Sequence, residues 1–334
     1  MRTTIYDVAK EAKVSIATVS KVINNKGHIS EKTKRKVQEV IVALNYQPNM
    51  MASALMGKRT KTIGLLIPDI ANPFFSELAR SIEDRGHEFG YNLVMCSTDY
   101  IQEKENKYIT LLKRKSVDGF IIASGFENLD KIEELVKEDI PVAIVARDSP
   151  MFYVNTVALD DFMGGYLAAS HLIELGHKNI GVIARDVWSN RERLRGFKQA
   201  LEENKLEFTP DFEFIKEINH IEAGKYMTRK YLDAPHPPTA IFACNDLLAA
   251  GVIQGGKEVG MSVPEDLSVI GFDNTILATI IEPPLTTISQ PIQNMGKEVM
   301  DIMISMITGE VKEKRRLTLL PSLVERKSTS KLTV

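Results

Sequence analysis

Cysteine, tryptophan and histidine are scarce in this 334-residue sequence, which holds two, one and six of them. Cys96 and Cys244 each lie in an apolar, strand-like context, so we expect buried free thiols and neither a disulfide nor a nucleophile. His171 and His177 are the only histidines near each other, and their places are typical of a helix end and a turn. Without a cluster of ligating side chains, the sequence predicts no metal site.

Long apolar runs are missing as well. No stretch approaches the ~18 apolar residues of a membrane helix, and the N-terminus lacks the apolar core of a signal peptide. We therefore expect a cytoplasmic protein that has no membrane partner and is not exported.

Enzymatic motifs are incomplete. Segment 251–257 has the spacing of a phosphate-binding P-loop, but Glu258 stands where a magnesium-binding Ser or Thr belongs. The segment is also patterned as an amphipathic helix and not as a loop between a strand and a helix. Since no other catalytic constellation is found, we expect neither an enzyme nor a cofactor.

What the sequence does contain begins with a helical head. Three helices are predicted, each preceded by a capping Thr4, Ser15 or Ser30: residues 5–12, 16–24 and 31–44. Apolar side chains at helical spacing should close one small core: Ile5, Val8, Ala9, Ala12, Val19, Val22, Ile23, Val37, Val40, Ile41 and Leu44. Two helices joined by a tight turn form a helix-turn-helix, whose second helix fits a DNA major groove ~12 Å wide.

The charge distribution supports this DNA-binding interpretation. Residues 1–60 hold 11 Lys and Arg against 4 Asp and Glu, whereas the other 274 residues hold 31 against 40. A basic head on an acidic body is typical of a separate phosphate-binding module. The alternative is an all-helical domain without a nucleic-acid partner, and the basic charge argues against it.

The remainder of the chain is patterned as an α/β protein. Short apolar runs alternate with amphipathic helical stretches: IGLLIP (63–68), NLVMC (92–96), GFIIA (119–123), PVAIV (141–145), NIGVI (179–183), TAIFA (239–243) and LSVIG (267–271). Runs that are apolar on both faces predict buried parallel strands, and the restart of the alternation predicts two similar lobes.

A ligand cleft is expected where the carboxyl ends of these strands face each other. Polar or aromatic residues gather at those ends, and we predict that they bind a small effector: Asp69, Asn72, Phe74, Arg147, Trp188, Arg193, Asn245 and Asp273. Arg193 and Asp273 can bind hydroxyl or anionic groups, and Phe74 or Trp188 can stack on a flat or sugar-like face. The alternative for any one of them is that strand ends are polar in general.

Together these runs carry a family resemblance. TIYDVAKEA (4–12), VSIATVSKVIN (14–24) and LNYQPN (44–49) resemble the DNA-binding head of LacI/GalR-family transcriptional regulators. DIANPFF (69–75), HLIELGH (171–177), ND (245–246), GFDN (271–274) and PLTTISQP (284–291) resemble the periplasmic-binding-protein-like core of the same family. The chain is most similar to the catabolite-control and degradation-activator branch of Gram-positive bacteria.

The resemblance implies which residues contact DNA: Thr4, Tyr6, Ser15, Ile16, Ala17, Thr18, Ser20, Lys21, Asn24, His28, Asn49, Ala52, Ser53 and Leu55. Ile16 and Ala17 would read bases. Lys21 replaces the usual Arg and so offers a point charge instead of a bidentate fork. Residues 49–56 would form a hinge helix only when two copies pair in the minor groove, with Leu55 as the wedge that kinks the duplex.

The expected architecture is an N-terminal all-α helix-turn-helix (lambda-repressor-like) domain plus a two-lobed α/β periplasmic-binding-protein-like core. The domain bounds are 1–47, a hinge at 48–60 and a core at 61–334, whose lobes comprise 61–160 with 291–318 and 161–290 with 319–330. In catabolite-control members a phosphorylated carrier protein docks through an aromatic residue and an Arg, where this chain has Gln293 and Asp301. A small molecule is therefore the expected effector: a sugar, a sugar phosphate or a similar polar metabolite.

The expected function is that of a nucleoid-associated homodimeric repressor that binds a palindromic double-stranded DNA operator under effector control. Two apolar stripes are candidates for the dimer face or for the core of one lobe: Phe75, Leu78, Ala79 and Ile82, and Met295, Val299, Ile302, Met303 and Met306. The alternative function is a cytoplasmic or periplasmic-type sugar-binding protein without DNA regulation, and a sugar- or nucleotide-processing enzyme ranks third.

Overall fold

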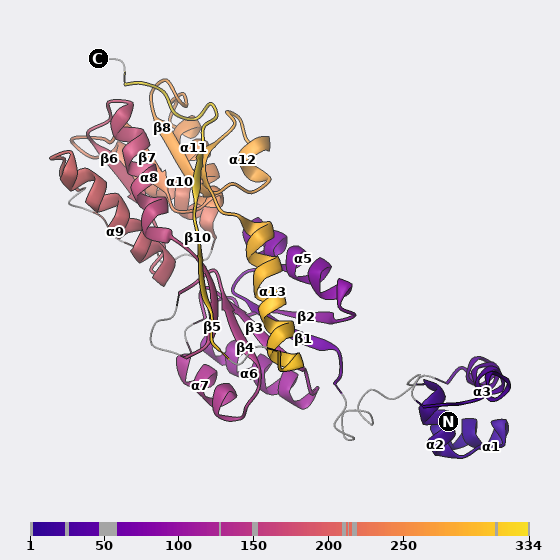
Figure 1. Cartoon of the computed structure of the whole chain (residues 1–334). Helices are drawn as coiled ribbons and strands as arrows, with labels where there is room; N and C mark the ends of the chain where they lie inside the picture. Colours follow the sequence, from indigo (N-terminus) through magenta and orange to yellow (C-terminus); the bar gives the residue numbers. More distant parts are fainter. Residues whose placement is uncertain are drawn as a thin grey trace. The chain divides into compact units, whose positions relative to one another are not determined.

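The computed structural model describes residues 3–23, 27–46, 59–126, 128–148, 153–208, 212, 214–215, 219–310 and 313–332. The chain divides into two compact units, Met1–Thr60 and Lys61–Val334. In Figure 1 the smaller unit is indigo and the larger one runs from violet to yellow.

The smaller unit is helical in its described part, with α1 (Ile5–Ala12), α2 (Ile16–Ile23) and α3 (Glu31–Ala43). Its core contains every apolar side chain that the helical spacing predicts, so that prediction is confirmed. Ser15 and Ser30 cap α2 and α3, because their hydroxyls accept from the amides of Thr18 at 3.1 Å and Thr33 at 3.3 Å.

The two ends of α1 differ from each other. At the N-terminus Thr4 and Asp7 form a capping box, and the Thr4 hydroxyl also donates to the Asp7 carboxylate at 2.7 Å. The Thr4 amide donates to the same oxygen at 2.8 Å, and these bonds lower the pKa of Asp7. At the other end Lys13 has a left-handed backbone with φ 52° and ψ 46°, where the side chain of an L-residue is crowded.

The larger unit contains two sheets, one in each lobe. The sheet of the first lobe is parallel throughout, in the order β10-β5-β4-β3-β1-β2. Its strands are β1 (Thr62–Ile67), β2 (Asn92–Ser97), β3 (Gly119–Ala123), β4 (Val142–Val145), β5 (Asn155–Leu159) and β10 (Arg316–Leu319). The sheet of the second lobe has the order β11-β9-β8-β7-β6, with only β11 antiparallel. Its strands are β6 (Ile180–Ile183), β7 (Ala240–Ala243), β8 (Ser268–Asp273), β9 (Thr286–Ser289) and β11 (Ser322–Val324).

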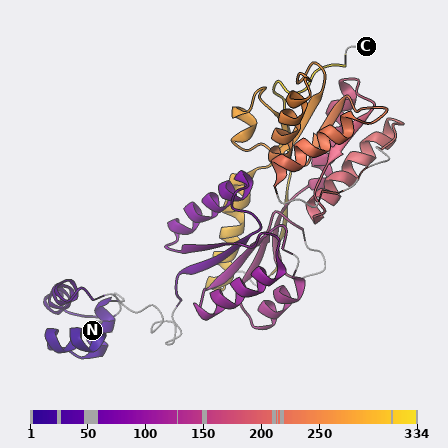
Figure 2. The ribbon, with the colours of Figure 1, turned by 180° about the vertical axis from the view of Figure 1, so that it is seen from behind.

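Helices cover both faces of each sheet, as Figures 1 and 2 show from opposite sides. In the first lobe, α5 (Pro73–Glu88) and α13 (Ile292–Thr308) pack on one face, and α6 (Gln102–Arg114) and α7 (Leu129–Lys137) on the other. In the second lobe the two pairs are α8 (Asp161–Glu174) with α9 (Trp188–Glu203), and α10 (His220–Leu232) with α11 (Asp246–Glu258). A short α12 (Leu277–Ile280) follows β8. The described helices include none that is long and apolar enough to span a membrane.

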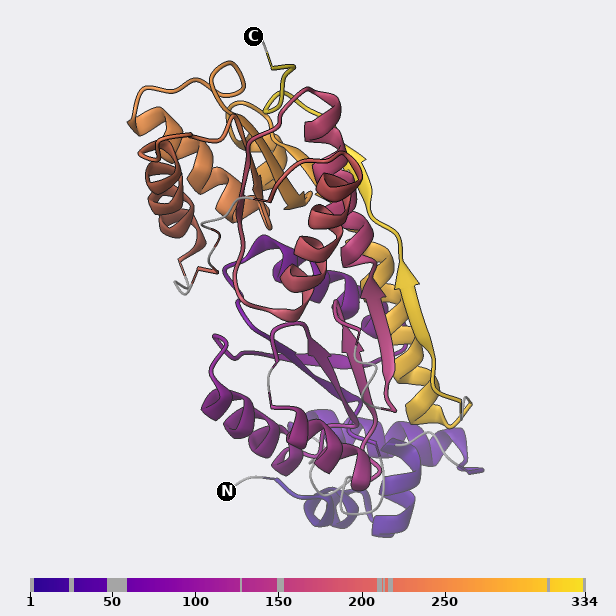
Figure 3. The ribbon, with the colours of Figure 1, turned by 90° about the vertical axis from the view of Figure 1, so that its left-hand side faces the viewer.

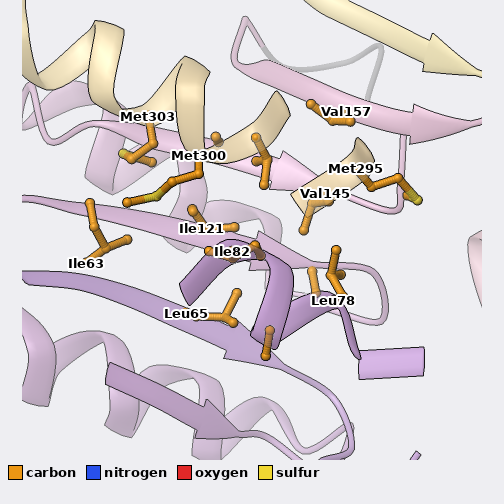
Figure 4. Close-up of a cluster of buried hydrophobic side chains, with 14 of the residues drawn as sticks. Ile63, Leu65, Leu78, Ile82, Ile121, Val145, Val157, Met295, Met300 and Met303 are labelled. Carbon is orange, nitrogen blue, oxygen red and sulfur yellow. The ribbon is translucent and has the colours of Figure 1, made fainter. Parts of the chain in front are cut away.

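The apolar stripes of α5 and α13 belong to the core of the first lobe. Figure 4 shows Leu78 and Ile82 of α5 among Met295, Met300 and Met303 of α13. Every one of the eight stripe residues from Phe75 to Met303 is at most 7 % exposed, and Met306 packs against the same cluster. The dimer-face interpretation of these stripes is therefore wrong, because α13 returns from the second lobe to cover the first sheet.

Strand β2 is more exposed than the sequence pattern predicts. The sequence pattern predicts a strand that is buried on both faces, but β2 lies at the edge of its sheet. Val94 and Met95 are consequently 36 % and 38 % exposed.

The chain crosses between the lobes after β5, after β9 and after β10. Figure 3 shows the last crossing, where the yellow C-terminal strand lies beside α13 and continues into the second lobe. The expected buried thiols are confirmed, since Cys96 and Cys244 are buried and free. Segment 251–257 lies within α11, as its amphipathic pattern predicts.

Candidate functional sites

The head carries large exposed side chains that its core does not use. Ile16 at the start of α2 is 41 % exposed and Tyr6 on α1 is 68 % exposed. Ala17 and Lys21 are exposed on the same helix as Ile16. An exposed apolar side chain and an exposed cation on one helix are suited to contact another molecule.

Hydroxyls gather at the N-terminus of α2, the place where a helix binds an anion most readily. Ser15 Oγ lies 2.9 Å from Thr18 Oγ1, and Ser15 is exposed. Thr4 and His28 are also exposed, whereas Thr18 and Ser20 are partly buried. The remaining predicted DNA contacts, and the expected hinge helix with them, lie outside the described residues: Asn24, Asn49, Ala52, Ser53 and Leu55.

In the larger unit, the carboxyl ends of strands from both lobes converge on a cavity of about 50 Å³. The first lobe contributes Asn72, Phe74, Phe75, Tyr100, Ser124, Gly125 and Ala146. The second lobe and its connection contribute Arg185, Val187, Ser189, Asn190, Arg193, His220, Cys244, Asn245, Asp273 and Gln290. A volume of this size holds only a few waters, so a larger ligand requires the lobes to separate.

Helix caps fix two of the amide side chains in the lining. Asn72 Oδ1 accepts from the amide of Phe74 at 3.0 Å and begins α5. Asn245 Oδ1 accepts from the amide of Leu248 at 2.7 Å and begins α11, which leaves its Nδ2 for His220. The strand-to-helix connections therefore orient these side chains by the same bonds that start the helices.

Arg193 is the centre of a buried polar network. Its Nε donates to Asp161 Oδ1 at 2.7 Å and its Nη1 donates to the Cys244 carbonyl at 2.6 Å. Nη1 also lies 3.9 Å from Asp273 Oδ1, which accepts from Gln290 Nε2 at 2.6 Å. Burial raises the pKa of Asp161 to about 6 and that of Asp273 well above its usual value, while the charge of Arg193 opposes both shifts.

Asp273 also has an uncommon backbone conformation, with φ 109°. A non-glycine residue adopts this conformation at a cost, which the surrounding structure must offset. The bond to Gln290 and the proximity of Arg193 hold the carboxyl toward the cavity. The network can therefore present both donors and acceptors to a hydroxylated ligand.

Arg185, Tyr100 and His220 form a second group in the lining. The guanidinium of Arg185, from the second lobe, lies 3.7 Å from the ring centre of Tyr100, from the first lobe. Burial, assisted by the charge of Arg185, lowers the pKa of His220 to about 4. Burial raises the pKa of Tyr100 and of Cys244 to about 12. All three groups are therefore neutral near pH 7, and Arg185 carries the charge.

The cavity brings together five of the eight predicted effector residues: Asn72, Phe74, Arg193, Asn245 and Asp273. The other three lie outside its lining. Asp69 accepts from the amide of Ala71 at 2.8 Å, Arg147 Nη1 donates to the Phe126 carbonyl at 2.7 Å, and Trp188 begins α9 partly buried. Effector binding by all eight remains a prediction.

Sequence reasoning missed Tyr100, Arg185, His220 and Gln290. Three of them follow strands: Tyr100 follows β2, Arg185 follows β6 and Gln290 follows β9. The strand-end argument therefore finds these three when it is applied to every strand. His220 is the first residue of α10, and no sequence pattern distinguishes it from other helix starts.

Comparison with known proteins identifies the family. The family model described as bacterial regulatory proteins, lacI family, matches residues 4–49, and the model of a periplasmic binding protein-like domain matches residues 169–329. The HTH-type transcriptional regulator DegA of Bacillus subtilis (strain 168) is 49 % identical, over 99 % of each chain. The chain belongs to the lacI family. It is therefore a DNA-binding transcriptional regulator with an effector-binding core and not an enzyme.

Solved structures agree with this fold. The lac repressor dimer bound to operator and the anti-inducer ONPF has a TM-score of 0.87 and 30 % identity, over 99 % of this chain and 100 % of that one. A LacI family regulator from Enterococcus faecium with bound ribose has a TM-score of 0.74 and 36 % identity, over 81 % of this chain and 100 % of that one. The expected fold class is confirmed, and the LacI-type head excludes a sugar-binding protein without DNA regulation.

Proposed function

We propose that this lacI-family regulator is a cytoplasmic homodimeric repressor whose affinity for a palindromic operator depends on a small polar effector in the cavity. The observation that carries the proposal is the convergence of Arg193, Asp273 and Gln290 on one cavity, where the buried carboxylate of Asp161 holds Arg193 from behind. Enclosed spaces with a few convergent polar groups are typical ligand sites. The ribose bound by the Enterococcus faecium relative supports a sugar-like ligand.

Exposed apolar side chains support the pairing of two copies. Val94 and Met95 on β2 are 36 % and 38 % exposed, and Ile276 and Ile280 around α12 are 58 % and 66 % exposed. Figures 1 and 2 show β2 and α12 along the same side of the core. Pairing along this side would bury apolar surface from both lobes, as a two-fold interface requires. The lac repressor dimer bound to its operator supports the pairing of two copies.

The effector would act through linkage. A ligand that prefers one degree of lobe closure shifts the population of that state, and a dimer with two heads transmits the shift to operator affinity. Two heads related by a two-fold axis would read half-sites about 34–36 Å apart, so the operator should be an approximate palindrome.

Selection from a random pool of duplexes tests the proposal, with purified full-length protein and with or without candidate metabolites. We expect enrichment of a palindrome and a change of its affinity with one metabolite. No preferred duplex under any condition would contradict DNA regulation, and a single unrepeated half-site would contradict the homodimer. A palindrome whose affinity no metabolite alters would contradict effector control.

The same assay locates the base-reading surface. Ile16→Ala should change the preferred bases. Lys34→Ala removes a positive charge from α3 of the basic head and should weaken binding to all sequences alike, because attraction to phosphates carries no sequence information. The reverse pattern would show that α2 is not the recognition helix.

A further inference from the structure

Two hydrogen-bond donors in the cavity lack an acceptor among the residues that the structure describes. They are Nε2 of His220 and Nη1 of Arg185, and both residues line the cavity. A buried donor without a partner is costly, and such groups in native proteins call for an explanation. A ligand that brings the missing acceptor provides one.

Asn245 determines which nitrogen of His220 carries the proton. Its Oδ1 accepts from Leu248, so its Nδ2 faces His220 Nδ1 at 2.9 Å and donates to it. Nδ1 therefore accepts, and the proton of the neutral ring is on Nε2. The lowered pKa keeps the ring neutral at pH 7, and the side chain is only 5 % exposed. His220 is thus a fixed, uncharged N–H donor.

Arg185 supplies charge without a carboxylate partner. Arg193 is paired with Asp161 and Asp273, but Arg185 makes no ion pair within 4.0 Å in the described part of the chain. Its guanidinium lies on the ring of Tyr100, which fixes the plane of the fork. The carboxylate of Asp69 is near enough to affect Tyr100 and His220, but it lies outside the lining.

Resting on the function proposed above, we infer that the effector is a sugar acid whose carboxylate is bound by Arg185 and His220. Two donors match the two oxygens of a carboxylate, and a guanidinium recognises that planar group well. Arg193, Asp273 and Gln290 remain for the hydroxyl groups of the same ligand. A phosphate ester carries about −1.5 to −2 charge at pH 7. One unpaired cation in the described lining matches the single charge of a carboxylate better.

Calorimetric titration of the full-length protein tests the inference. The probes are D-ribonate, D-gluconate and D-glucuronate, the neutral sugars D-ribose and D-glucose, and D-ribose 5-phosphate. At least one acid should bind roughly tenfold more tightly than the neutral sugar of equal carbon number, as one charge-assisted bond implies. Arg185→Gln should remove about tenfold of this preference and affect the neutral sugar little.

Arg195→Gln is the matched control, because Arg195 is 65 % exposed, pairs with Glu192 on the same helix and lies outside the lining. It should leave both affinities unchanged. The inference is overturned by tighter binding of a neutral sugar or of the phosphate ester, or by an unchanged preference in Arg185→Gln. It is also overturned if no acid binds to a preparation that selects its operator. Binding of an acid without selection of any duplex would count against the regulatory function alone.

Discussion

The contact between α8 and α9 is so close that one added methyl group should open it. A β-carbon at Gly165 would lie 1.7 Å from the carbonyl oxygen of Arg193, and one at Gly196 would lie 1.8 Å from that of Phe162. Real β-carbons essentially never approach a non-bonded heavy atom of another part of the chain within 3.0 Å. Gly165→Ala must therefore separate the two helices by roughly 1.3 Å or more, and close-packed interiors transmit such a shift.

The cost follows from what the methyl group meets. Overpacking a core by one methyl group costs about 1–3 kcal/mol, and backbone atoms cannot rotate away, so we expect about 3 kcal/mol for Gly165→Ala. For a domain of this size each kcal/mol lowers the melting temperature by about 2–4 °C, which gives a loss of roughly 6–12 °C. The same shift moves Arg193 away from Asp161, so effector binding should weaken too.

Gly256→Ala on α11 is the matched control. The atoms nearest to its added β-carbon lie at 4.0 Å, which is ordinary contact. Alanine is favoured over glycine in a helix by about 1 kcal/mol, so this variant should melt at or above the temperature of the wild type. Thermal unfolding of the full-length proteins, followed by circular dichroism, gives both values. A melting temperature of Gly165→Ala equal to that of Gly256→Ala would refute the argument.

Lys13, Val94 and His220 allow three independent tests. Lys13→Gly relieves the left-handed backbone at φ 52° and should stabilise the head by about 1 kcal/mol, measured by hydrogen exchange of the head amides; faster exchange would contradict this. Val94→Glu should yield monomers in sedimentation, whereas Leu320→Glu, at a 72 % exposed site, should not; a dimeric Val94→Glu protein would exclude pairing along β2. His220 has a folded pKa of about 4 against an ordinary 6.5, so the unfolded chain binds more protons between these values. Relative to His220→Gln, the wild type should lose about 3 kcal/mol of unfolding free energy as the pH falls through this window, and parallel curves would contradict the shift.

The helices of the head could be predicted from the sequence because their signals are local. A capping hydroxyl and apolar residues at helical spacing lie within a few positions of each other, and Val8, Val19 and Val37 are fully buried as expected. The bond that the Thr4 hydroxyl donates to the carboxylate of Asp7 is not predicted from the sequence. It depends on side-chain distances that a sequence pattern does not contain.

The stripes of α5 and α13 could be recognised as apolar but not assigned a partner. Whether such a stripe faces a second copy or the same lobe depends on which segment returns to cover the sheet, and α13 follows β9 of the other lobe. The same reason explains β2, whose apolar residues would be buried if another strand lay beside it. Strand order is a long-range property, so the edge position is known only from the assembled sheet.

The cavity network also depends on long-range geometry, and this has a mechanical consequence. Asp161 begins α8 directly after the first crossing between the lobes, and Gln290 precedes the second crossing. Arg193 bonds to Asp161, and Asp273 bonds to Gln290, so the polar network ends on two of the segments that connect the lobes. A ligand that alters either bond therefore acts on the crossings themselves. We expect substitutions at Asp161 or Gln290 to change the coupling between effector and operator as well as the affinity for the effector, because these residues belong to the cavity network and lie beside the crossings.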